Sequence, residues 1–191
     1  LTGYTAATYL RGIKFIQVPT TLLAQTDSSI GGKTGVDFRG YKNMVGAFHQ
    51  PSLVYMNMDT INTLDERQFL SGLGEVIKSA LIKDISLLDY IEEHTQEIIN
   101  KDTDALTRIV TNSCIIKKGV VERDPKEFGE RALLNFGHTL GHAIEKCADF
   151  KILHGECVVL GMVAALKISL SRGLISEADY NRVYELFEKL G

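Results

Sequence analysis

Residues 135–145 read NFGHTLGHAIE, and residues 153–156, which read LHGE, follow after a short interval. The apolar spacing of the first segment predicts a helix, which would place His138 and His142 one above the other on a single face. His154 lies beyond a loop that could fold back toward them. Three of the chain's five histidines therefore fall in one short region, and we interpret this cluster as the centre around which the chain is organised.

The histidine cluster raises the question of a metal. Neutral imidazole is the commonest metal ligand in proteins, and two histidines four residues apart on a helix are a geometry found in zinc proteins. The HExxH motif of zinc proteases is excluded, because Thr139 stands where that motif has glutamate. A catalytic zinc takes three protein ligands, so His154 and a carboxylate from elsewhere would complete a set. The alternative is that each histidine is simply hydrogen-bonded in the core or on the surface.

A candidate carboxylate lies in residues 72–78, which read GLGEVIK. Two glycines in a helical pattern each cost about 1 kcal/mol relative to alanine, so we expect close approach of a ligand or another helix here. Glu75 and Lys78 would share one face, and spacing alone slightly favours a solvated ion pair. Cys147 and Cys157 have no paired spacing, and we interpret them as small buried hydrophobic residues.

Composition excludes several classes of protein. The 191 residues are 45% hydrophobic and 24% charged, which is typical of a globular protein with one or two domains. A formal net charge of −3 gives no general attraction to nucleic acid or anionic lipid. No apolar run approaches the roughly 20 residues of a membrane-spanning helix. Three cysteines without a CxxC pair indicate a reducing compartment, and we expect a cytoplasmic protein.

The N-terminal part mixes helix and strand. We expect a helix over residues 5–10, strands over 14–18 and 52–56, and a helix that begins within 20–27. Residues 31–35 are expected to form a loop, because three of the five are glycine. Leu1 in place of Met, without a signal peptide, leads us to expect a fragment of a longer protein.

From residue 63 onward the pattern is helical. Residues 63–66 form a capping box, which predicts a helix that continues to about Lys83. Further helices are expected over residues 86–100, 103–122, the cluster segment, 156–172 and from 176 onward. We therefore predict an α/β part over residues 1–58 and a mainly α-helical part over residues 59–191.

Two basic groups could bind anions. The sequence of residues 31–34, GGKT, is similar to the end of a Walker A loop, but Asp27 stands where that loop needs glycine. Flexible amides with Lys33, Lys42 and Arg39 could still bind an anion, and a surface loop is the alternative.

A second basic group precedes the histidine cluster and consists of Lys117, Arg123 and Arg131. Arg131 leads directly into the cluster, where a fixed guanidinium could hold a carboxylate or phosphate with two hydrogen bonds. We interpret Arg123 as a surface charge.

Taken together, these segments resemble one family, the 3-dehydroquinate synthases of the shikimate pathway. The matching segments occur in the family's order and are RGI (11–13), PTTLLAQTDSSIGGKTG (19–35), KN (42–43), GEVIK (74–78), RALLNFGHTLGHAIE (131–145) and LHGE (153–156).

The resemblance implies an NAD-binding α/β domain, of which residues 1–58 would be the C-terminal remnant, followed by a helical metal-binding domain. The active site would lie in the cleft between them. It implies Glu75, His138 and His154 as ligands of zinc or cobalt, with His142 beside the metal in a proton-handling role. The implied contacts to NAD+ are Thr20, Thr21, Leu23, Asp27, Ser28, Lys33, Lys42 and Thr63. The implied substrate pocket contains Asp27, Lys33, Asn43, Lys78, Lys117, Arg131, Asn135 and His142.

The implied reaction converts 3-deoxy-D-arabino-heptulosonate 7-phosphate to 3-dehydroquinate and phosphate, with NAD+ regenerated in each turnover. Arg11 is similar to the family's phosphate-binding arginine, which is expected to reach a neighbouring subunit in a homodimer. The family's glycine-rich segment and lysine-bearing C-terminal region are missing, so the fragment alone is expected to bind NAD+ weakly or to be inactive. We expect no nucleic-acid or membrane partner. The alternatives are another sugar-phosphate cyclase, an NAD- and metal-dependent polyol dehydrogenase, and a non-catalytic, metal-stabilised helical interaction module.

Overall fold

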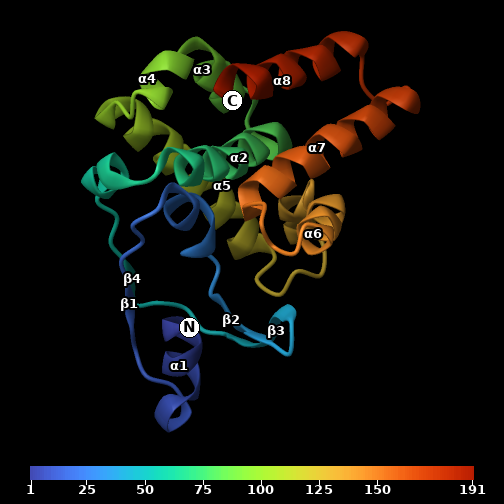
Figure 1. The fold of residues 1–191 in the computed structure, drawn as a ribbon. Coiled ribbons are helices and arrows are strands. Elements are labelled where there is room, and N and C mark those ends of the chain that lie inside the picture. Colours follow the sequence, from blue (N-terminus) through green and yellow to red (C-terminus); the bar gives the residue numbers. More distant parts are fainter.

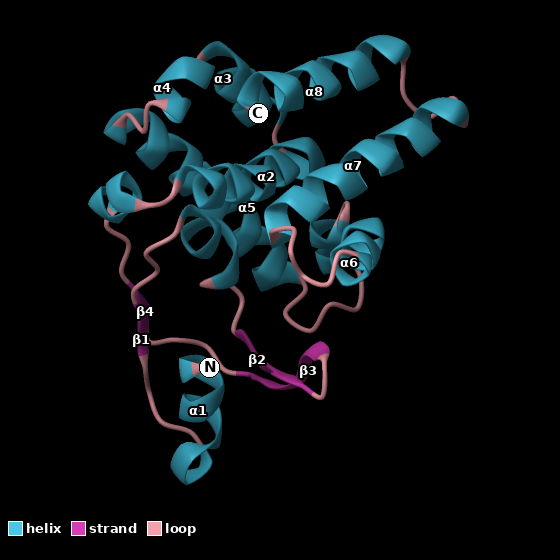
Figure 2. Cartoon of the chain, in the orientation of Figure 1, coloured by secondary structure: helices cyan, strands magenta, loops and turns pink.

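The computed structural model describes all of residues 1–191, with a smaller N-terminal part below a helical body (Figure 1). Helix α1 (Thr2–Thr8) precedes strand β1 (Ile16–Gln17), which pairs in parallel with β4 (Leu53–Val54). Strands β2 (Lys33–Phe38) and β3 (Tyr41–Phe48) form an antiparallel hairpin (Figure 2). The expected first helix and both expected strands are confirmed, although each strand is only two residues long.

The hairpin corrects the prediction of a loop over residues 31–35. Only Gly31 and Gly32 have positive φ angles, 102° and 65°, whereas Lys33 begins β2. The turn between the strands is Arg39-Gly40, and both residues have positive φ, as a two-residue hairpin turn requires. Most residues of the two strands are exposed, so the sequence lacks the alternation of a half-buried strand, and this is why the hairpin was missed.

Seven α-helices form the body. They are α2 (Glu66–Lys83), α3 (Ile85–Glu93), α4 (Thr95–Ile99), α5 (Thr103–Arg123), α6 (His138–Cys147), α7 (His154–Ser171) and α8 (Glu177–Leu190). The predicted helix over 103–122 is confirmed, and so is the last one, which Ser176 caps through the Asp179 backbone N–H.

Three helix boundaries differ from the predictions. Asp65, and not Thr63, caps α2, since its side chain accepts hydrogen bonds from the backbone N–H groups of residues 67 and 68. The segment over 86–100 is divided at His94 into α3 and α4. Helix α7 begins at His154, two residues earlier than expected, which places this histidine in the first helical turn.

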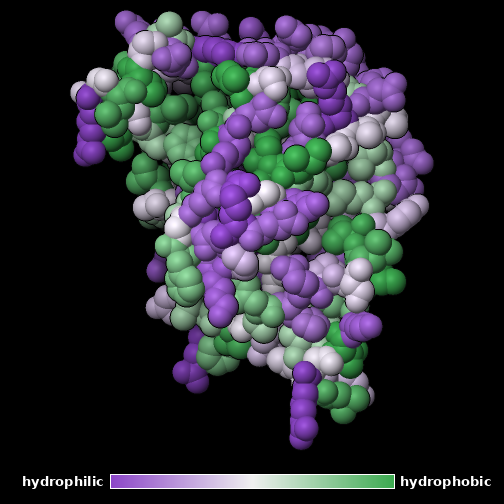
Figure 3. Space-filling view, turned by 180° about the vertical axis from the view of Figure 1, so that it is seen from behind, coloured by the Kyte–Doolittle hydropathy of each residue, from purple (hydrophilic) through white to green (hydrophobic).

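The core lies around α2, which packs against α3, α5 and α7 (Figure 1). Its apolar face carries Phe69, Leu73 and Ile77, each with 1% of its surface exposed. Each such side chain stabilises the fold by about 1.5–3 kcal/mol. The opposite view shows hydrophilic residues along the upper edge of the molecule and hydrophobic residues in scattered patches (Figure 3).

The expected second helix is present and connects the two parts. Residues 22 and 23 are α-helical and Ala24–Ser28 form a π-helix, which packs on α2 and α5. A Cβ atom on Gly72 would lie 2.8 Å from the Leu23 backbone nitrogen, so the glycine allows this close contact. This contact places Asp27, near the end of the π-helix, against the helical body.

Helix α7 corrects the expectation that no apolar run approaches a membrane-spanning length. Its 18 residues are long and apolar enough, by length and composition, to cross a membrane. However, it packs against α2, α6 and α8 in this fold and carries a candidate metal ligand as its first residue.

Glycines bring α7 into backbone contact with two neighbouring helices. A Cβ atom on Gly155 would collide with the Ser71 carbonyl oxygen of α2, and one on Gly161 would collide with the Gly137 carbonyl oxygen before α6. A Cβ atom on Gly74 would lie 3.0 Å from the Gly155 carbonyl oxygen. The predicted close approach of another helix is therefore confirmed.

We expect Gly155→Ala to lower the free energy of unfolding by about 1–3 kcal/mol or more, because overpacking costs this much and the collision is with backbone. The same change would displace His154 and weaken metal binding. Urea unfolding and a metal titration measure both effects. Gly119→Ala is the matched control, since its nearest neighbour is the flexible Arg123 side chain at 3.3 Å. A Gly155→Ala chain as stable as Gly119→Ala would contradict the rigid helix contact.

Candidate metal centre and adjoining pocket

A pocket of about 640 Å³ lies between the hairpin and the helical body. Its walls include β2, β3, α5, α6 and the loop before α6. The residues anticipated from the sequence that line it are Asp27, Ser28, Lys33, Asn43, Lys78, Lys117, Arg131, Asn135, His138, His142 and His154. Segments that are up to 127 residues apart therefore meet in one site, since the lining runs from Asp27 to His154.

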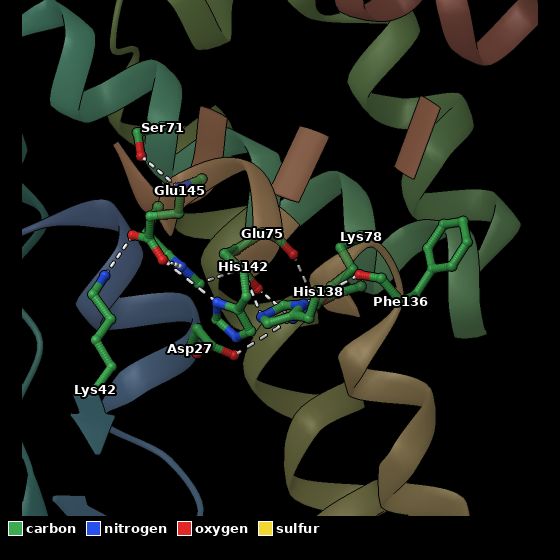
Figure 4. Close-up of polar contacts among 12 residues, drawn as sticks. Asp27, Lys42, Ser71, Glu75, Lys78, Phe136, His138, His142 and Glu145 are labelled. Atoms are coloured by element: carbon green, nitrogen blue, oxygen red, sulfur yellow. Dashed lines mark hydrogen bonds and ion pairs between the residues drawn. The ribbon is translucent and has the colours of Figure 1, made fainter. Parts of the chain in front are cut away.

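Glu75, His138 and His154 converge beside the pocket, and Figure 4 shows Glu75 next to His138. The Glu75 Oε1 atom lies 3.7 Å from His138 Nε2 and 3.5 Å from His154 Nε2. Zinc with bonds of about 2.0–2.2 Å separates tetrahedral ligand atoms by roughly 3.3–3.5 Å. The three side chains are thus spaced for a divalent metal, and two of them, His138 and His154, line the pocket.

The environment of His138 suits a metal ligand. Its Nδ1 atom lies 3.2 Å from the Phe136 carbonyl oxygen, an arrangement that puts the proton on Nδ1 and leaves the Nε2 lone pair free. Burial and the positive charge of Lys78 lower the pKa of the imidazole, so the ring is neutral near pH 7. A neutral ring is the form that binds metal.

The surroundings of the Glu75 carboxylate also suit a bound metal ion. Its side chain is 1% exposed and, apart from an ion pair with Lys78, neither carboxylate oxygen has a hydrogen-bond partner. Burial and Asp27 raise the pKa of Glu75, but His154, Lys78 and His138 outweigh them and the net shift is downward. An ionised, buried and unsatisfied carboxylate beside two imidazole nitrogens fits a cation. The expected solvated ion pair is wrong, because both partners are buried.

Opposite charges alternate along the floor of the pocket. The Lys117 Nζ atom lies 2.7 Å from Asp27 Oδ1, and Lys78 Nζ lies 3.9 Å from the same oxygen. Burial raises the pKa of Asp27, but the two lysines outweigh it and hold the pKa well below its usual range. Asp27 therefore stays ionised and connects Lys117 with the Glu75–Lys78 pair.

Arg131 lines the pocket and is fixed by backbone contacts. Its buried guanidinium donates to the Pro125 carbonyl oxygen at 2.6 Å and to the Gly31 carbonyl oxygen at 3.0 Å. Both terminal nitrogens therefore bind backbone, which fixes the guanidinium at the pocket wall, as predicted. Whether it also binds an anion stays a prediction.

Glu127 was missed by the sequence analysis. It lies in the loop before α6 with a φ of 64°, pairs with Lys33 and accepts a hydrogen bond from Asn135 Nδ2 at 2.7 Å. These contacts join two residues that were both anticipated in the pocket. A loop residue carries no periodic signal, so nothing in the sequence pattern singled it out.

Glu145 was also missed, although its position carried a signal. It follows His142 by three residues and His138 by seven, so all three lie on one face of α6. The buried carboxylate pairs with Lys42 of β3, and its Oε2 lies 3.4 Å from His142 Nδ1. His142 itself does not contact Glu75 and lies beside the ligand set.

Several anticipated residues do not line the pocket. These are Arg11, Thr20, Thr21, Leu23, Lys42 and Thr63, and the buried ligand candidate Glu75 is not part of the lining either. Arg11 is exposed beyond α1, Thr21 accepts a hydrogen bond from the Ala24 backbone N–H, and Thr63 donates to the Thr60 carbonyl oxygen. Their roles toward NAD+ or phosphate stay predictions.

Four other expectations are settled by burial and contacts. Arg39 lies at the hairpin turn over the Phe38 ring, so it does not join Lys33 in an anion site. Arg123 is a surface charge paired with Glu130, as predicted. Cys157 is buried, as predicted, whereas Cys147 is exposed.

Sequence comparison finds two family models along the chain. The model described as 3-dehydroquinate synthase N-terminal matches residues 1–71, and the model described as 3-dehydroquinate synthase C-terminal matches residues 72–191. A 3-dehydroquinate synthase of Acetivibrio thermocellus is 53% identical over all of this chain and one of Ruminiclostridium cellulolyticum is 52% identical. In each case the match covers 53% of the relative, so the chain spans about half the length of these proteins.

Structural comparison finds two similar synthases with bound groups. A 2-epi-5-epi-valiolone synthase of Streptomyces hygroscopicus with NAD+ and Zn²⁺ bound matches with a TM-score of 0.94 and 32% identity, over 99% of this chain and 53% of that one. A 2-deoxy-scyllo-inosose synthase complexed with carbaglucose-6-phosphate, NAD+ and Co²⁺ matches with a TM-score of 0.92 and 31% identity, over 99% and 52%.

Proposed function

Because this chain belongs to the 3-dehydroquinate synthase family, we propose that the whole protein converts 3-deoxy-D-arabino-heptulosonate 7-phosphate to 3-dehydroquinate and phosphate. The observation that carries the proposal is the convergence of Glu75, His138 and His154 beside a pocket lined by lysines, a fixed arginine and Asn135. A sugar acid phosphate needs cations for its two anionic groups and a metal for its hydroxyls, and the pocket contains residues of both kinds.

We propose that Glu75, His138 and His154 hold Zn²⁺ or Co²⁺, as the spacing of their ligand atoms allows. When bound, the metal would lower the pKa of a substrate hydroxyl and polarise a carbonyl, and NAD+ would provide a hydride acceptor that is regenerated in each turnover. The two structural relatives that bind NAD+ with Zn²⁺ or Co²⁺ support this assignment.

The chain's own residues would bind and orient the substrate. Lys33 is the accessible cation, with 48% of its side chain exposed, and we propose that a substrate anion replaces Glu127 as its partner. Asn135, which also binds Glu127, would donate to the same anion. Lys117 and Asp27 form a fixed ion pair on the pocket floor, so their charges need no reorganisation during the reaction.

His142 is the candidate for proton transfer. Its side chain is 53% exposed and faces the pocket, and its Nδ1 atom points to Glu145. The Nε2 atom is therefore left to accept a proton from a substrate hydroxyl.

The remaining assignments are proposals of the same kind. Residues 1–58 would belong to the NAD-binding domain. The contacts to NAD+ would come from Thr20, Thr21, Leu23, Asp27, Ser28, Lys33 and Lys42 of this part and from Thr63 of the helical part. Arg11, exposed at the tip of the N-terminal part, would reach the partner's site in a homodimer. The three free cysteines fit a reducing compartment such as the cytoplasm.

The proposal is tested by phosphate release from the heptulosonate phosphate, measured with the full-length protein. We expect release to require NAD+ and to stop when a chelator removes the metal. Activity that survives complete chelation would contradict the proposed mechanism.

Lys33→Ala in the same assay is expected to reduce kcat/KM by about one to two orders of magnitude, since lost charge-assisted bonds of about 1.5–3 kcal/mol act at a positioned anion. Metal content should stay unchanged, because Lys33 contacts no ligand. Lys118→Ala, an exposed lysine of α5, is the control. Full turnover by Lys33→Ala would remove Lys33 from the proposed substrate site.

A different sugar-phosphate cyclase activity is the second candidate, favoured by the two structural relatives, which make valiolone and inosose rings. Phosphate release from the heptulosonate phosphate is compared with release from a sugar phosphate that lacks the carboxylate. The substrate that is turned over faster decides between the two activities. Accumulation of NADH during turnover would instead indicate a polyol dehydrogenase.

A further inference from the structure

A second carboxylate faces the histidine cluster from the side opposite Glu75. Glu145 has 4% of its side chain exposed, and its Oε2 atom lies 3.4 Å from His142 Nδ1 and 4.0 Å from His154 Nδ1. Figure 4 shows it between His142 and Lys42, which pairs with the other carboxylate oxygen. A charged side chain this deeply buried needs partners, and those available are one lysine and two histidines.

The two nitrogens of His154 therefore face two different carboxylates. Its Nε2 atom lies 3.5 Å from Glu75 Oε1, at the proposed metal position, while its Nδ1 atom is directed to Glu145. At 4.0 Å the negative charge of Glu145 favours a proton on Nδ1 without a direct hydrogen bond, which leaves the Nε2 lone pair for a metal. For His142, the same carboxylate keeps Nε2 free to accept a proton in the pocket.

Distance alone would also allow His142, Glu145 and His154 to hold a second metal. Two observations argue against this reading. His142 is 53% exposed, and a neutral His154 ring has only one nitrogen lone pair, which lies at Nε2 beside Glu75 in the proposed site. The arrangement suits orientation of the rings better than coordination.

Lys42 connects Glu145 to a distant part of the chain. It belongs to β3 of the hairpin and meets α6 across a sequence separation of 103 residues. Its Nζ atom also lies 5.0 Å from the centre of the Phe150 ring, so it is held from two sides. The Lys42–Glu145 pair thus connects the hairpin to the rings at the metal centre.

We propose that Glu145 is a positioning residue that fixes the Nδ1–H tautomers of His142 and His154 and connects them to the hairpin through Lys42. This rests on the proposed function, because it takes Glu75, His138 and His154 as the metal site.

The first measurement is zinc affinity of the chain by competition with a chromogenic chelator. We expect Glu145→Ala to bind zinc about 10–100-fold more weakly, the usual cost of removing an outer partner of a metal-bound histidine, with one metal per chain. Glu145→Gln keeps the size and one acceptor, so its loss should be smaller, and it serves if the alanine variant does not fold. Glu122→Gln, an exposed carboxylate on α5, is the control.

The second measurement is NMR of the histidine ring nitrogens in the metal-free chain, which reports the tautomers without any metal. We expect His154 and His142 to carry the proton on Nδ1 in the parent and to become mixtures of tautomers in Glu145→Gln. Unchanged ring signals, unchanged affinity, or a second bound zinc that Glu145→Ala removes would overturn the proposal. Glu75→Gln is measured in parallel, since full zinc binding by that variant refutes the proposed metal centre without bearing on the tautomers.

Discussion

Glu75→Gln is expected to abolish tight metal binding and, in the full-length protein, turnover. The change removes the only charged ligand of the proposed set, whose Oε1 atom lies within 3.7 Å of both ligand nitrogens. Loss of a direct ligand should exceed the 10–100-fold loss of affinity that removal of an outer partner causes. Metal content after dialysis, and chelator competition for residual binding, measure the effect.

Glu130→Gln is the matched control for this experiment. Glu130 is a carboxylate that pairs with Lys83 and Arg123 and does not line the pocket. Its variant should keep the parent's metal content. If Glu75→Gln retained as much tightly bound zinc as Glu130→Gln, the three-residue site would be wrong.

Lys78→Met is expected to destabilise the metal-free chain by about 3–5 kcal/mol, the range for breaking a buried ion pair on one side. Lys78 is 2% and Glu75 1% exposed, so the carboxylate would be left charged, buried and without its cation. Bound metal would supply a replacement positive charge. The destabilisation should therefore be smaller in zinc, and urea unfolding with and without the metal measures the difference.

Two comparisons make the Lys78 experiment specific. Lys118→Met changes an exposed lysine and should leave the free energy of unfolding nearly unchanged. The double variant Glu75→Gln/Lys78→Met removes both charges and should be more stable in the metal-free state than Lys78→Met alone. If the two single lysine variants unfolded alike, the buried pair would not contribute as the structure indicates.

Local patterns in the sequence predicted most helices well. Capping residues and glycine stops depend on neighbours in sequence, so α5 and α8 were placed within a residue of their observed ends. The hairpin was missed because its strands are mostly exposed and are stabilised by pairing with each other. Pairing between strands is a tertiary property for which an irregular apolar pattern gives no signal.

The spacing of residues along the sequence did not predict which side chains form the candidate metal site. Helical periodicity correctly placed His138 beside His142, and their ring centres lie 5.3 Å apart, but the ligand atoms group His138 with His154 and Glu75, from three different helices. Only the family resemblance selected these three. Burial was equally hidden, since a Glu–Lys pair three residues apart looks the same in sequence whether it faces water or the core.

The glycine contacts of α7 have a consequence for how the sequence can vary over evolution. Where helices touch through side chains, a change on one helix can be compensated by a change on the other. Gly155 and Gly161 instead meet carbonyl oxygens of Ser71 and Gly137, which are present whatever residue occupies those positions. No second substitution can remove a backbone carbonyl oxygen, so we expect these two positions to stay glycine. Residues on the outward face of α7 are free of this constraint.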